Sequence, residues 1–299
     1  MIRVFRIENI QEWKYYIKKC DNYDFYHTWN YHKICSDNNQ GDPELIVMEE
    51  DCELIVFPLL KREIKDEFGR HQGFDYSSVY GYVGPIVGGE IGAKTIVKFQ
   101  DLFKNHCREN NIVSVFSRLH PTLNQERIIS SIGLVEENCK TINIDLTKTL
   151  EEQRRQYRKS NKSEINKLRK ESVVFWSENN SRDLEEFVEI YEETMNRVNA
   201  HERYFFKKEY YESLFNNDEF ETKLLFVEYE GVKIAGALFV FCNNTIQYHL
   251  AGTRTSFMKI NPMKLLLDEV RLFGKKEGYI NFHLGGGISS SEEDPLFRF

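Results

Sequence analysis

The stretch LIVMEEDCELIVF at residues 45–57 holds two apolar runs joined by a polar turn, and KLLFVEYEGVKIAGALFVF at residues 223–241 repeats this arrangement. Short apolar runs bounded by turn residues are typical of buried strands. Each stretch therefore predicts a pair of strands joined by a tight turn. The two halves of the chain contain the same strand–turn–strand unit.

The elements after this unit are repeated as well. A third strand, an amphipathic helix and a short last strand are expected at 79–83, 93–110 and 112–116 in the first half, and at 245–251, 262–276 and 279–284 in the second. A repeat of this length predicts two similar α/β domains with mixed sheets, which we place at residues 1–146 and 147–299. We expect a ligand site in the cleft between them, where small-molecule sites are common.

The composition is that of a globular protein, because 41% of the 299 residues are hydrophobic and 29% are charged. No apolar run approaches the ~20 residues that span a bilayer. The six cysteines are scattered without a C-x-x-C pair, which favours reduced thiols and a cytoplasmic location. The histidines show no metal-binding spacing, so no metal is expected. A G-x-S-x-G elbow is absent too, which leaves a hydrolase without support.

The net charge of −7 conceals a basic segment. Residues 154–170 hold eight Lys or Arg and one acidic residue, a local charge of +7 that leaves −14 for the rest. Such clustering indicates contact with phosphates, nucleic acid or an anionic membrane surface, although a solvated helix face is the alternative. Within a helix expected at 150–170, Arg158, Lys159 and Lys162 share one face and are the candidate phosphate contacts.

Three residues are candidates for the chemistry itself. Arg118 and His120 follow the strand at 112–116, at the strand end where α/β sheets commonly expose functional groups. Strand alternation puts His249 on the same face as Gln247, so it could act as a base or orient an acceptor. The alternatives are a histidine that caps a turn for His120 and an ordinary core histidine for His249.

A second set of residues is expected to contact substrate. These are Tyr80, Tyr82, Tyr204, His283, Gly285 and Gly286. The tyrosines could stack on sugar rings, although aromatic residues at such spacing are more often part of a core. The two glycines would let the backbone approach a ligand closely, with a mobile linker as the alternative.

Several local motifs occur together along the chain. They are YGYVGP at 80–85, SRLHP at 117–121, YRKSNK at 157–162, HLGGG at 283–287 and DPLFRF at 294–299. In this order, with the repeated elements, they resemble the FemAB family, in which two tandem GNAT domains transfer aminoacyl groups to peptidoglycan precursors. The resemblance extends to relatives from cell-surface polysaccharide loci and covers nearly the whole chain.

The chain departs from this family in two ways. It has no long helical arm between the domains. It also ends at Phe299, where members usually continue into a closing strand, so either the sequence is shortened there or the second domain closes differently.

The resemblance implies an acyl- or aminoacyltransferase that acts by direct attack on an acyl-CoA or aminoacyl-tRNA donor. The acceptor would be an amine on a cell-envelope precursor, either a nucleotide- or lipid-linked amino sugar or a stem peptide. Donor phosphates would lie near Arg254 and Asn261, because a helix start favours anions. The usual glycine-rich signature is missing there, and Asn261-Pro262 is also an ordinary helix start.

Expected partners are a phosphorylated sugar or peptidoglycan-type precursor, tRNA, and a membrane surface reached through a lipid-linked substrate, with the chain a monomer or a weak homo-oligomer. Two other functions stay open. A catalytically silent GNAT-fold module that binds a glycan or a protein would fit the missing glycine-rich loop. A nucleic-acid-binding protein acting through residues 154–170 is opposed by the acidic remainder of the chain.

Overall fold

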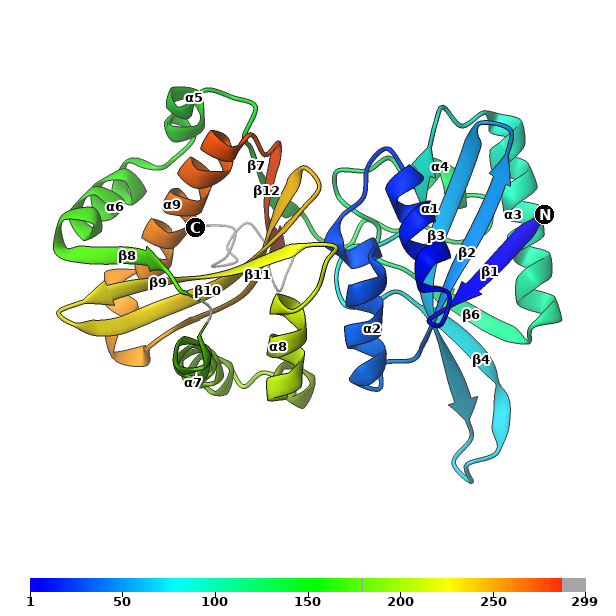
Figure 1. Cartoon of the computed structure of the whole chain (residues 1–299), viewed down its shortest axis with the longest axis horizontal. Helices are drawn as coiled ribbons and strands as arrows, with labels where there is room; N and C mark the ends of the chain where they lie inside the picture. The colour runs from blue at the N-terminus through cyan, green and yellow to red at the C-terminus, as the bar shows by residue number, and fades with distance from the viewer. Residues whose placement is uncertain (179, 287–299) are drawn as a thin grey trace. The chain divides into compact units, whose positions relative to one another are not determined.

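A computed structural model describes residues 1–178 and 180–286. The chain divides into two compact units, Met1–Glu137 and Asn138–Phe299, and each is described by itself. Each unit is built on a mixed six-stranded sheet with helices packed on both of its faces (Figure 1). The predicted α/β class with mixed sheets is confirmed.

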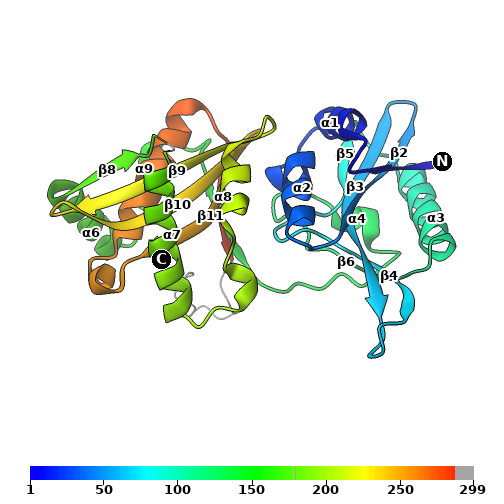
Figure 2. The ribbon, with the colours of Figure 1, turned by 60° about the horizontal axis from the view of Figure 1, so that its bottom comes forward.

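Unit 1 has the elements β1 (Ile2–Arg6), α1 (Ile10–Lys19), the 3₁₀ turn η1 (Phe25–His27), α2 (Trp29–Asp37), β2 (Asp42–Glu50), β3 (Glu53–Lys65), β4 (His71–Ser77), β5 (Ile86–Gly88), α3 (Ala93–Glu109), β6 (Ile112–Phe116) and α4 (Glu126–Ile129). Its strands lie in the order β1-β2-β3-β4-β6, with β5 paired to β3. Only β4 and β6 are parallel. Figure 2 shows the β3–β4 hairpin extending past the other strands.

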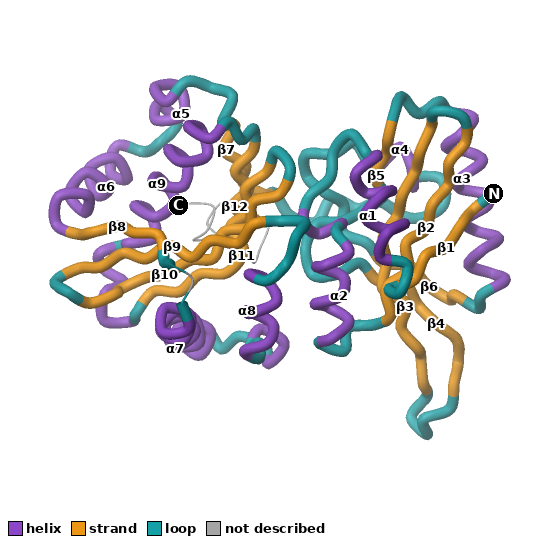
Figure 3. Tube along the Cα trace, in the orientation of Figure 1, coloured by secondary structure: helices purple, strands orange, loops and turns teal. Residues whose placement is uncertain are grey.

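Unit 2 has the elements β7 (Thr141–Asp145), α5 (Leu150–Arg155), α6 (Lys159–Glu171), β8 (Ser172–Trp176), α7 (Ser181–Arg197), the 3₁₀ turn η2 (Glu202–Tyr204), α8 (Lys208–Phe215), β9 (Glu221–Tyr229), β10 (Val232–Cys242), β11 (Thr245–Thr253), the 3₁₀ segment η3 (Thr255–Ile260), α9 (Pro262–Glu277) and β12 (Asn281–Gly286). Its strands lie in the order β7-β12-β11-β10-β9-β8. Helices α6 and α9 cover one face of the sheet, and α7 and α8 cover the other (Figure 3).

The repeat in the sequence is a repeat of the fold. The order β1-β2-β3-β4-β6 in unit 1 corresponds to β8-β9-β10-β11-β12 in unit 2. In both units the last two strands are parallel and a long helix, α3 or α9, connects them. Strand β7 has no counterpart in the described part of unit 1. It pairs antiparallel with β12 and covers that strand's outer edge.

Three expectations differ from the structure. The third strand of unit 1 lies at His71–Ser77, and residues 79–83 form the loop after it. Residues Thr141–Asp145 form β7, which belongs to the sheet of unit 2, so the units divide near residue 137 instead of residue 146. The helix expected at 150–170 is broken into α5 and α6, because Arg158 has extended backbone with ψ of 148°.

Local sequence explains where α9 begins and ends. Asn261 and Gly278 both have left-handed backbone, and Pro262 occupies the first helical position. Proline has the φ that a helix requires and no N–H to leave unpaired there. The apolar side of α9 packs on the sheet through Leu266, Leu267 and Val270. In the described part of the chain, no helix has both the length and the apolar character to cross a membrane.

Unit 1 buries two histidines completely. The His27 Nε2 lies 2.9 Å from the Val83 carbonyl oxygen, and the His32 Nδ1 lies 3.0 Å from that of Thr28. Burial disfavours the charged imidazolium and lowers the pKa of His27 to about 4 and that of His32 to about 3. Both residues are therefore neutral in the folded state at neutral pH.

We predict that unit 1 loses stability as the pH falls below about 6.5, because the unfolded histidines then bind protons that the folded ones do not. Above that pH neither histidine changes the free energy of unfolding. Below it, each one lowers this free energy by about 1.4 kcal/mol per pH unit, until the pH reaches its folded pKa. Urea unfolding between pH 7 and 5 measures this. A Trp176→Phe background leaves only Trp13 and Trp29, both in unit 1, as fluorescent reporters.

The comparison variant is His32→Phe. Its free energy of unfolding should change less steeply with pH than that of the parent, by the equivalent of about one proton. The control is His201→Gln, since His201 is exposed. Equal slopes for the parent and His32→Phe would contradict the prediction.

Candidate active site

The last two parallel strands of unit 2 separate after a short pairing. Strands β11 and β12 pair only over Thr245–Gln247 and Asn281–His283. Beyond this point each strand carries a β-bulge. In β11, Leu238 of β10 pairs with Leu250 and Phe239 with Tyr248, so His249 is the extra residue. In β12, the register against β7 shifts between His283 and Gly285.

A bulge bends its strand and re-aims the side chains beside it. Because both bulges directly follow the last pair, the two strands diverge from there towards their C-terminal ends. We call residues 247–253 of β11 and 283–286 of β12 the β11–β12 fork. Functional groups commonly lie at this end of parallel strands.

The base of the fork is a buried polar pair. The His283 Nδ1 lies 2.8 Å from the Gln247 Oε1, and the two residues are 0% and 1% exposed. His283 was expected to contact substrate. The structure places it beneath the fork, where it joins the last residues of the parallel ladder.

His249 lies on the bulge and contacts α8. Its Nε2 is 2.8 Å from the hydroxyl oxygen of Tyr210, and the two rings stack at 6.3 Å. Phe206 stacks on Tyr210 with the ring centres 4.1 Å apart. Tyr210 is 2% exposed, whereas His249 is half-buried. A phenol and an imidazole at this distance can pass one proton between them.

The bulge also reverses the alternation of β11. Before it, Ile246 and Tyr248 pack in the core cluster with α9. After it, Ala251 packs in the core cluster with α9, while a Cβ on Gly252 would lie 2.5 Å from the Ile190 carbonyl oxygen in α7. Strict alternation from Ile246 and Tyr248 would instead put Ala251 on the opposite face of the sheet.

The two residues expected at the donor phosphates lie in different surroundings. Asn261 is at the start of α9, and its side-chain amide donates to the Glu164 Oε2 at 3.1 Å. The Nε of Arg254 donates to the Lys233 carbonyl oxygen at 2.9 Å. The Arg254 guanidinium also lies 3.7–3.9 Å from the carboxylates of three residues of α7, namely Glu186, Glu189 and Glu193. Arg254 is thus balanced by the protein's own acidic residues.

In unit 1 the corresponding strands stay joined. After β4 and β6 end, the Ser78 N–H donates to the Phe116 carbonyl oxygen and the Val83 N–H to that of Arg118, both at 2.9 Å. Val83 and Leu119 then form a parallel bridge. The loop after β4 therefore follows the chain after β6 and closes the position that the fork occupies in unit 2.

His120 belongs to the network that holds this closure. Its Nε2 lies 3.1 Å from the Asp24 Oδ2, and the side chains are 2% and 1% exposed. Its main-chain N–H donates to the Gln125 Oε1 at 2.6 Å, and the Gln125 amide donates to the Val83 carbonyl oxygen at 2.6 Å. Within these contacts His120 stabilises a loop, in agreement with the alternative given for it above.

Arg118 and the two tyrosines of the loop lie near the surface of unit 1. The Arg118 guanidinium is 5.8 Å from the centre of the Tyr80 ring, and Tyr80 is 43% exposed. Tyr82 is half-buried and meets Tyr26 edge to face at 6.2 Å. The structure thus brings Arg118 and Tyr80 together.

The start of helix α3 in unit 1 is occupied by a carboxylate. In α3, the Gly92 N–H donates to the Glu53 Oε1 at 2.6 Å, and the Thr95 hydroxyl donates to the other carboxylate oxygen. These hydrogen bonds, from Thr95 and then Gly92, hold the pKa of Glu53 below its ordinary value. A carboxylate of the protein therefore occupies the place where α3 would hold an anionic ligand.

The basic segment is anchored to α9 through one buried carboxylate. Asp268 is 0% exposed and accepts from Arg169 at 2.8 Å, from Arg271 at 2.7 Å and from Arg154 at 3.3 Å. Burial alone would raise the pKa of Asp268, but Arg169 and Arg271 hold it below its ordinary value. This carboxylate fixes α5 and α6 against α9.

The three candidate phosphate contacts are not part of this anchor. Arg158 and Lys159 are exposed and Lys162 is half-buried. In residues 1–178 and 180–286, none of the three takes part in an ion pair. Arg158 precedes the first helical residue, so the three cluster around the N-terminus of α6 and do not run along a helix face.

The remaining candidates are dispersed within unit 2. The Tyr204 carbonyl oxygen accepts from the Tyr191 hydroxyl at 2.9 Å, and the Arg203 guanidinium lies 5.2 Å from the centre of the Tyr204 ring. Gly285 has a φ of +82°, and a Cβ added to it would meet no described atom within 4 Å, while Gly286 ends β12. Gly287 and the motif at 294–299 lie outside the described residues. Among those described, no three His, Cys, Asp or Glu side chains gather as a metal site.

Residues 155–292, most of unit 2, match the acetyltransferase (GNAT) domain. No curated protein sequence matches the chain. Among solved structures, FemX is similar with a TM-score of 0.73 and 13% identity over 98% of this chain and 90% of FemX.

Two further structures share the fold, each with a TM-score of 0.58 and 13% identity. One is the C-terminal domain of a protein described as a lysylphosphatidylglycerol synthetase from Agrobacterium fabrum, matched over 97% of this chain and 82% of that domain. The other is a conserved protein of unknown function from Bacteroides thetaiotaomicron, matched over 96% of this chain and 91% of that protein.

These matches show that residues 155–292 contain a GNAT acetyltransferase domain and that the chain has the fold of FemX. The matched domain agrees with the transferase class that the motifs indicated.

Three features of the site were not predicted from the sequence. Tyr210 is one of several aromatic residues in an amphipathic helix, and only its contact with His249 distinguishes it. The bulge at His249 has no marker such as glycine, so strict alternation was the natural expectation. Glu53 follows a turn, and its role appears only when α3 is folded above it.

We predict that Tyr210→Phe changes the surroundings of His249 without unfolding unit 2. The variant keeps the ring that stacks on Phe206 and removes the hydroxyl group that is bonded to Nε2. The ¹⁵N resonance of the His249 Nε2 should move, and the free energy of unfolding should fall by about 1 kcal/mol.

The matched control is Tyr211→Phe. The Tyr211 hydroxyl is buried and has no hydrogen-bond partner within the described ranges. Removing it should leave the His249 resonance in place and raise stability by about 1 kcal/mol. An unchanged His249 signal in Tyr210→Phe would show that the contact does not exist in solution.

Proposed function

We propose that this chain N-acylates an amine on a cell-envelope precursor, and that its acyl-CoA or aminoacyl-tRNA donor binds at the β11–β12 fork. The acceptor is a nucleotide- or lipid-linked amino sugar or a stem peptide. One observation carries the proposal: β11 and β12 diverge beside the Tyr210–His249 pair, whereas the equivalent strands of unit 1 are bridged. Since both donors are cytoplasmic, so is the protein.

The proposed chemistry needs one proton acceptor and a positioned carbonyl carbon. The acceptor amine attacks the donor carbonyl, a C–N bond forms, and the C–S or C–O bond to CoA or tRNA breaks. The amine proton passes to the Tyr210–His249 pair, which returns a proton to the leaving thiolate or alkoxide. No covalent enzyme intermediate is required. Gln247 and His283 hold the two strands together beneath the reacting groups.

The charge at the start of α6 supports a phosphorylated ligand. The first turn of α6 has no acidic residue, and Arg158, Lys159 and Lys162 surround it. Cations at a helix N-terminus oppose the helix dipole and cost up to about 1 kcal/mol each at an exposed site. An anionic ligand would reverse this cost, since a helix start and basic side chains both attract phosphate.

Two observations bear on the ligands. Arg254 lies beside three acidic residues of α7, whereas Asn261 contacts one carboxylate, that of Glu164, so the start of α9 is the better candidate for donor phosphates. A protein named for lysylphosphatidylglycerol shares the fold, which is compatible with an aminoacyl donor and an anionic, membrane-linked acceptor. We therefore retain tRNA and a lipid-linked precursor among the proposed partners.

The donor is tested by thermal stabilisation of the full chain. Acetyl-CoA and longer acyl-CoAs are compared with charged tRNA, and free CoA and uncharged tRNA are the controls. A ligand at one hundred times its Kd stabilises the folded state by about 2.7 kcal/mol. A shift with one class of donor identifies that class. No shift with either would instead favour a catalytically silent binding module, which the pairing of Arg254 with its own acidic neighbours would then explain.

We predict opposite effects of one charge reversal on stability and on ligand binding. Lys159→Glu places an acid in the first turn of α6, so it should raise the free energy of unfolding by about 0.5 kcal/mol. The same change should weaken the binding of a UDP-linked amino sugar and flatten its salt dependence. Triple alanine substitution at Arg158, Lys159 and Lys162 should weaken binding further.

The matched control for this prediction is Lys170→Ala. Lys170 is exposed and lies in the last turn of the same helix, where a cation agrees with the dipole. It should lose a little stability and leave ligand binding unchanged. Equal affinity of the parent and the triple variant would exclude these residues from the phosphate site.

A further inference from the structure

Strand β8 forms an edge of the sheet of unit 2. It pairs with β9 in a regular five-residue register, and within residues 1–178 and 180–286 no strand pairs with its other side. Natural edge strands are usually protected by a charged residue, a proline or a bulge. Ser172–Trp176 contains none of these, and Val173 is 59% exposed. The edge is therefore able to pair with another extended chain.

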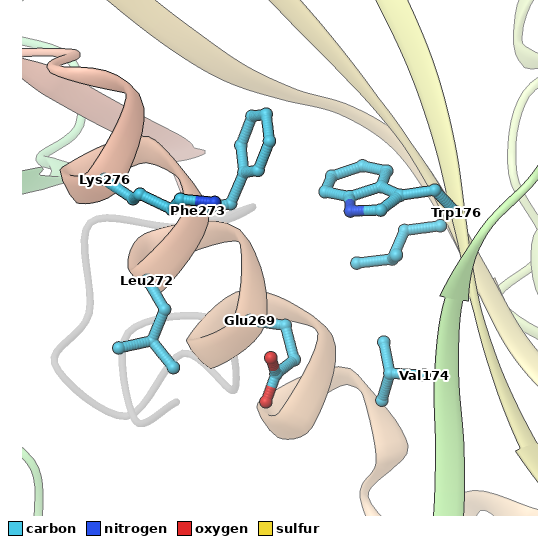
Figure 4. A pocket seen from close by; sticks show the side chains of 7 residues that line it. Val174, Trp176, Glu269, Leu272, Phe273 and Lys276 are labelled. Carbon is cyan, nitrogen blue, oxygen red and sulfur yellow. The ribbon is translucent and has the colours of Figure 1, made fainter.

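A hollow lies directly beside this edge. It encloses about 280 Å³ between alternate residues of β8 and one face of α9 (Figure 4). Its lining residues are Val174, Trp176, Leu225, Glu269, Leu272, Phe273 and Lys276. The α9 residues follow the i, i+3, i+4, i+7 spacing of a single helix face. The hollow is thus a groove between an edge strand and a helix.

The walls of this groove are aromatic and held in place. The rings of Trp176 and Phe273 lie 5.2 Å apart, and the Lys223 ammonium is 5.9 Å from the first and 5.0 Å from the second. None of the residues that line the groove belongs to the β11–β12 fork. The proposed chemistry therefore does not use the groove.

The charges at the rim indicate what the groove would accept. The Glu269 carboxylate already accepts from the Arg169 Nε at 3.0 Å. Lys276 is exposed and forms no ion pair with any described residue. The basic helix α6 packs beside the groove on α9. The uncompensated charge is therefore positive, which favours an acidic occupant and disfavours a second copy that would bring another basic α6 close by.

We propose that this groove binds an extended, acidic peptide segment of a partner protein. The segment pairs with β8 as a seventh strand of the sheet. It inserts one apolar side chain between Trp176 and Leu272 and places a carboxylate near Lys276. Main-chain pairing supplies affinity and the hollow supplies sequence preference, as in other cases of strand addition. The site is independent of acyl transfer.

The test begins with a random octapeptide library displayed on phage and selected against the immobilised full chain. Selected sequences should alternate apolar and polar residues and carry an acidic residue beside one large apolar residue. The same selection against Leu272→Trp, which fills the hollow from α9, should enrich nothing of this type. Enrichment of the same sequences by both proteins, or of none by the parent, would overturn the proposal.

A selected peptide, labelled with fluorescein, then measures the contacts by fluorescence polarisation. Leu272→Trp should weaken binding at least tenfold. Lys276→Glu should weaken it about fivefold, the effect of one partly exposed ion pair, and a peptide with Lys in place of its acidic residue should restore it. Lys259→Glu, an exposed reversal in η3, is the control and should change nothing. Binding insensitive to Leu272→Trp would place the peptide elsewhere, and melting curves of each variant exclude misfolding.

Discussion

The pairing of β11 with β12 is the interaction on which the rest of the site depends. It spans three residues of each strand and ends at two bulges, one in each strand. If the pairing of β11 with β12 continued, His249 would point in a different direction. Main-chain hydrogen bonds would then join the two strands along the length where they now diverge. The buried Gln247–His283 pair keeps the last rung in place. The Gln247–His283 hydrogen bond therefore fixes the two strands at the point where they begin to separate.

Unit 1 has the same topology and uses the same position for stability. Its loop after β4 is bridged to the chain after β6, and both His27 and Gln125 bond to the Val83 carbonyl oxygen. Its helix α3 begins on the carboxylate of Glu53. Both features disfavour binding of an anionic acyl donor in unit 1, because the N–H groups that would bind its phosphates already donate to groups of the protein. The division of roles between two copies of one fold thus follows from a few polar side chains.

Much of this fold could be predicted from the sequence. The hairpins and helices α3 and α9 follow from apolar periodicity, and Asn261-Pro262 marked the start of α9. The third strand of unit 1 was misplaced, because His71–Ser77 carries glycine and polar residues and forms part of a projecting, exposed hairpin. The site was predicted less well. His249 was identified by its strand face, but its partner Tyr210 is distant in sequence, and a bulge without glycine leaves no local signal.

The basic segment shows why counting charges in a sequence overestimates the number of cations that are available to a ligand. Of its eight cations, Arg154 and Arg169 are used to satisfy Asp268, a buried carboxylate that would otherwise be costly to desolvate. This anchor in turn fixes α6 on α9, and so fixes where the unpaired Arg158 and Lys159 stand. The paired cations therefore supply rigidity, and the unpaired ones remain for a ligand. A backbone fixed in advance loses less entropy on binding, which makes this small cluster a better phosphate contact than the whole segment.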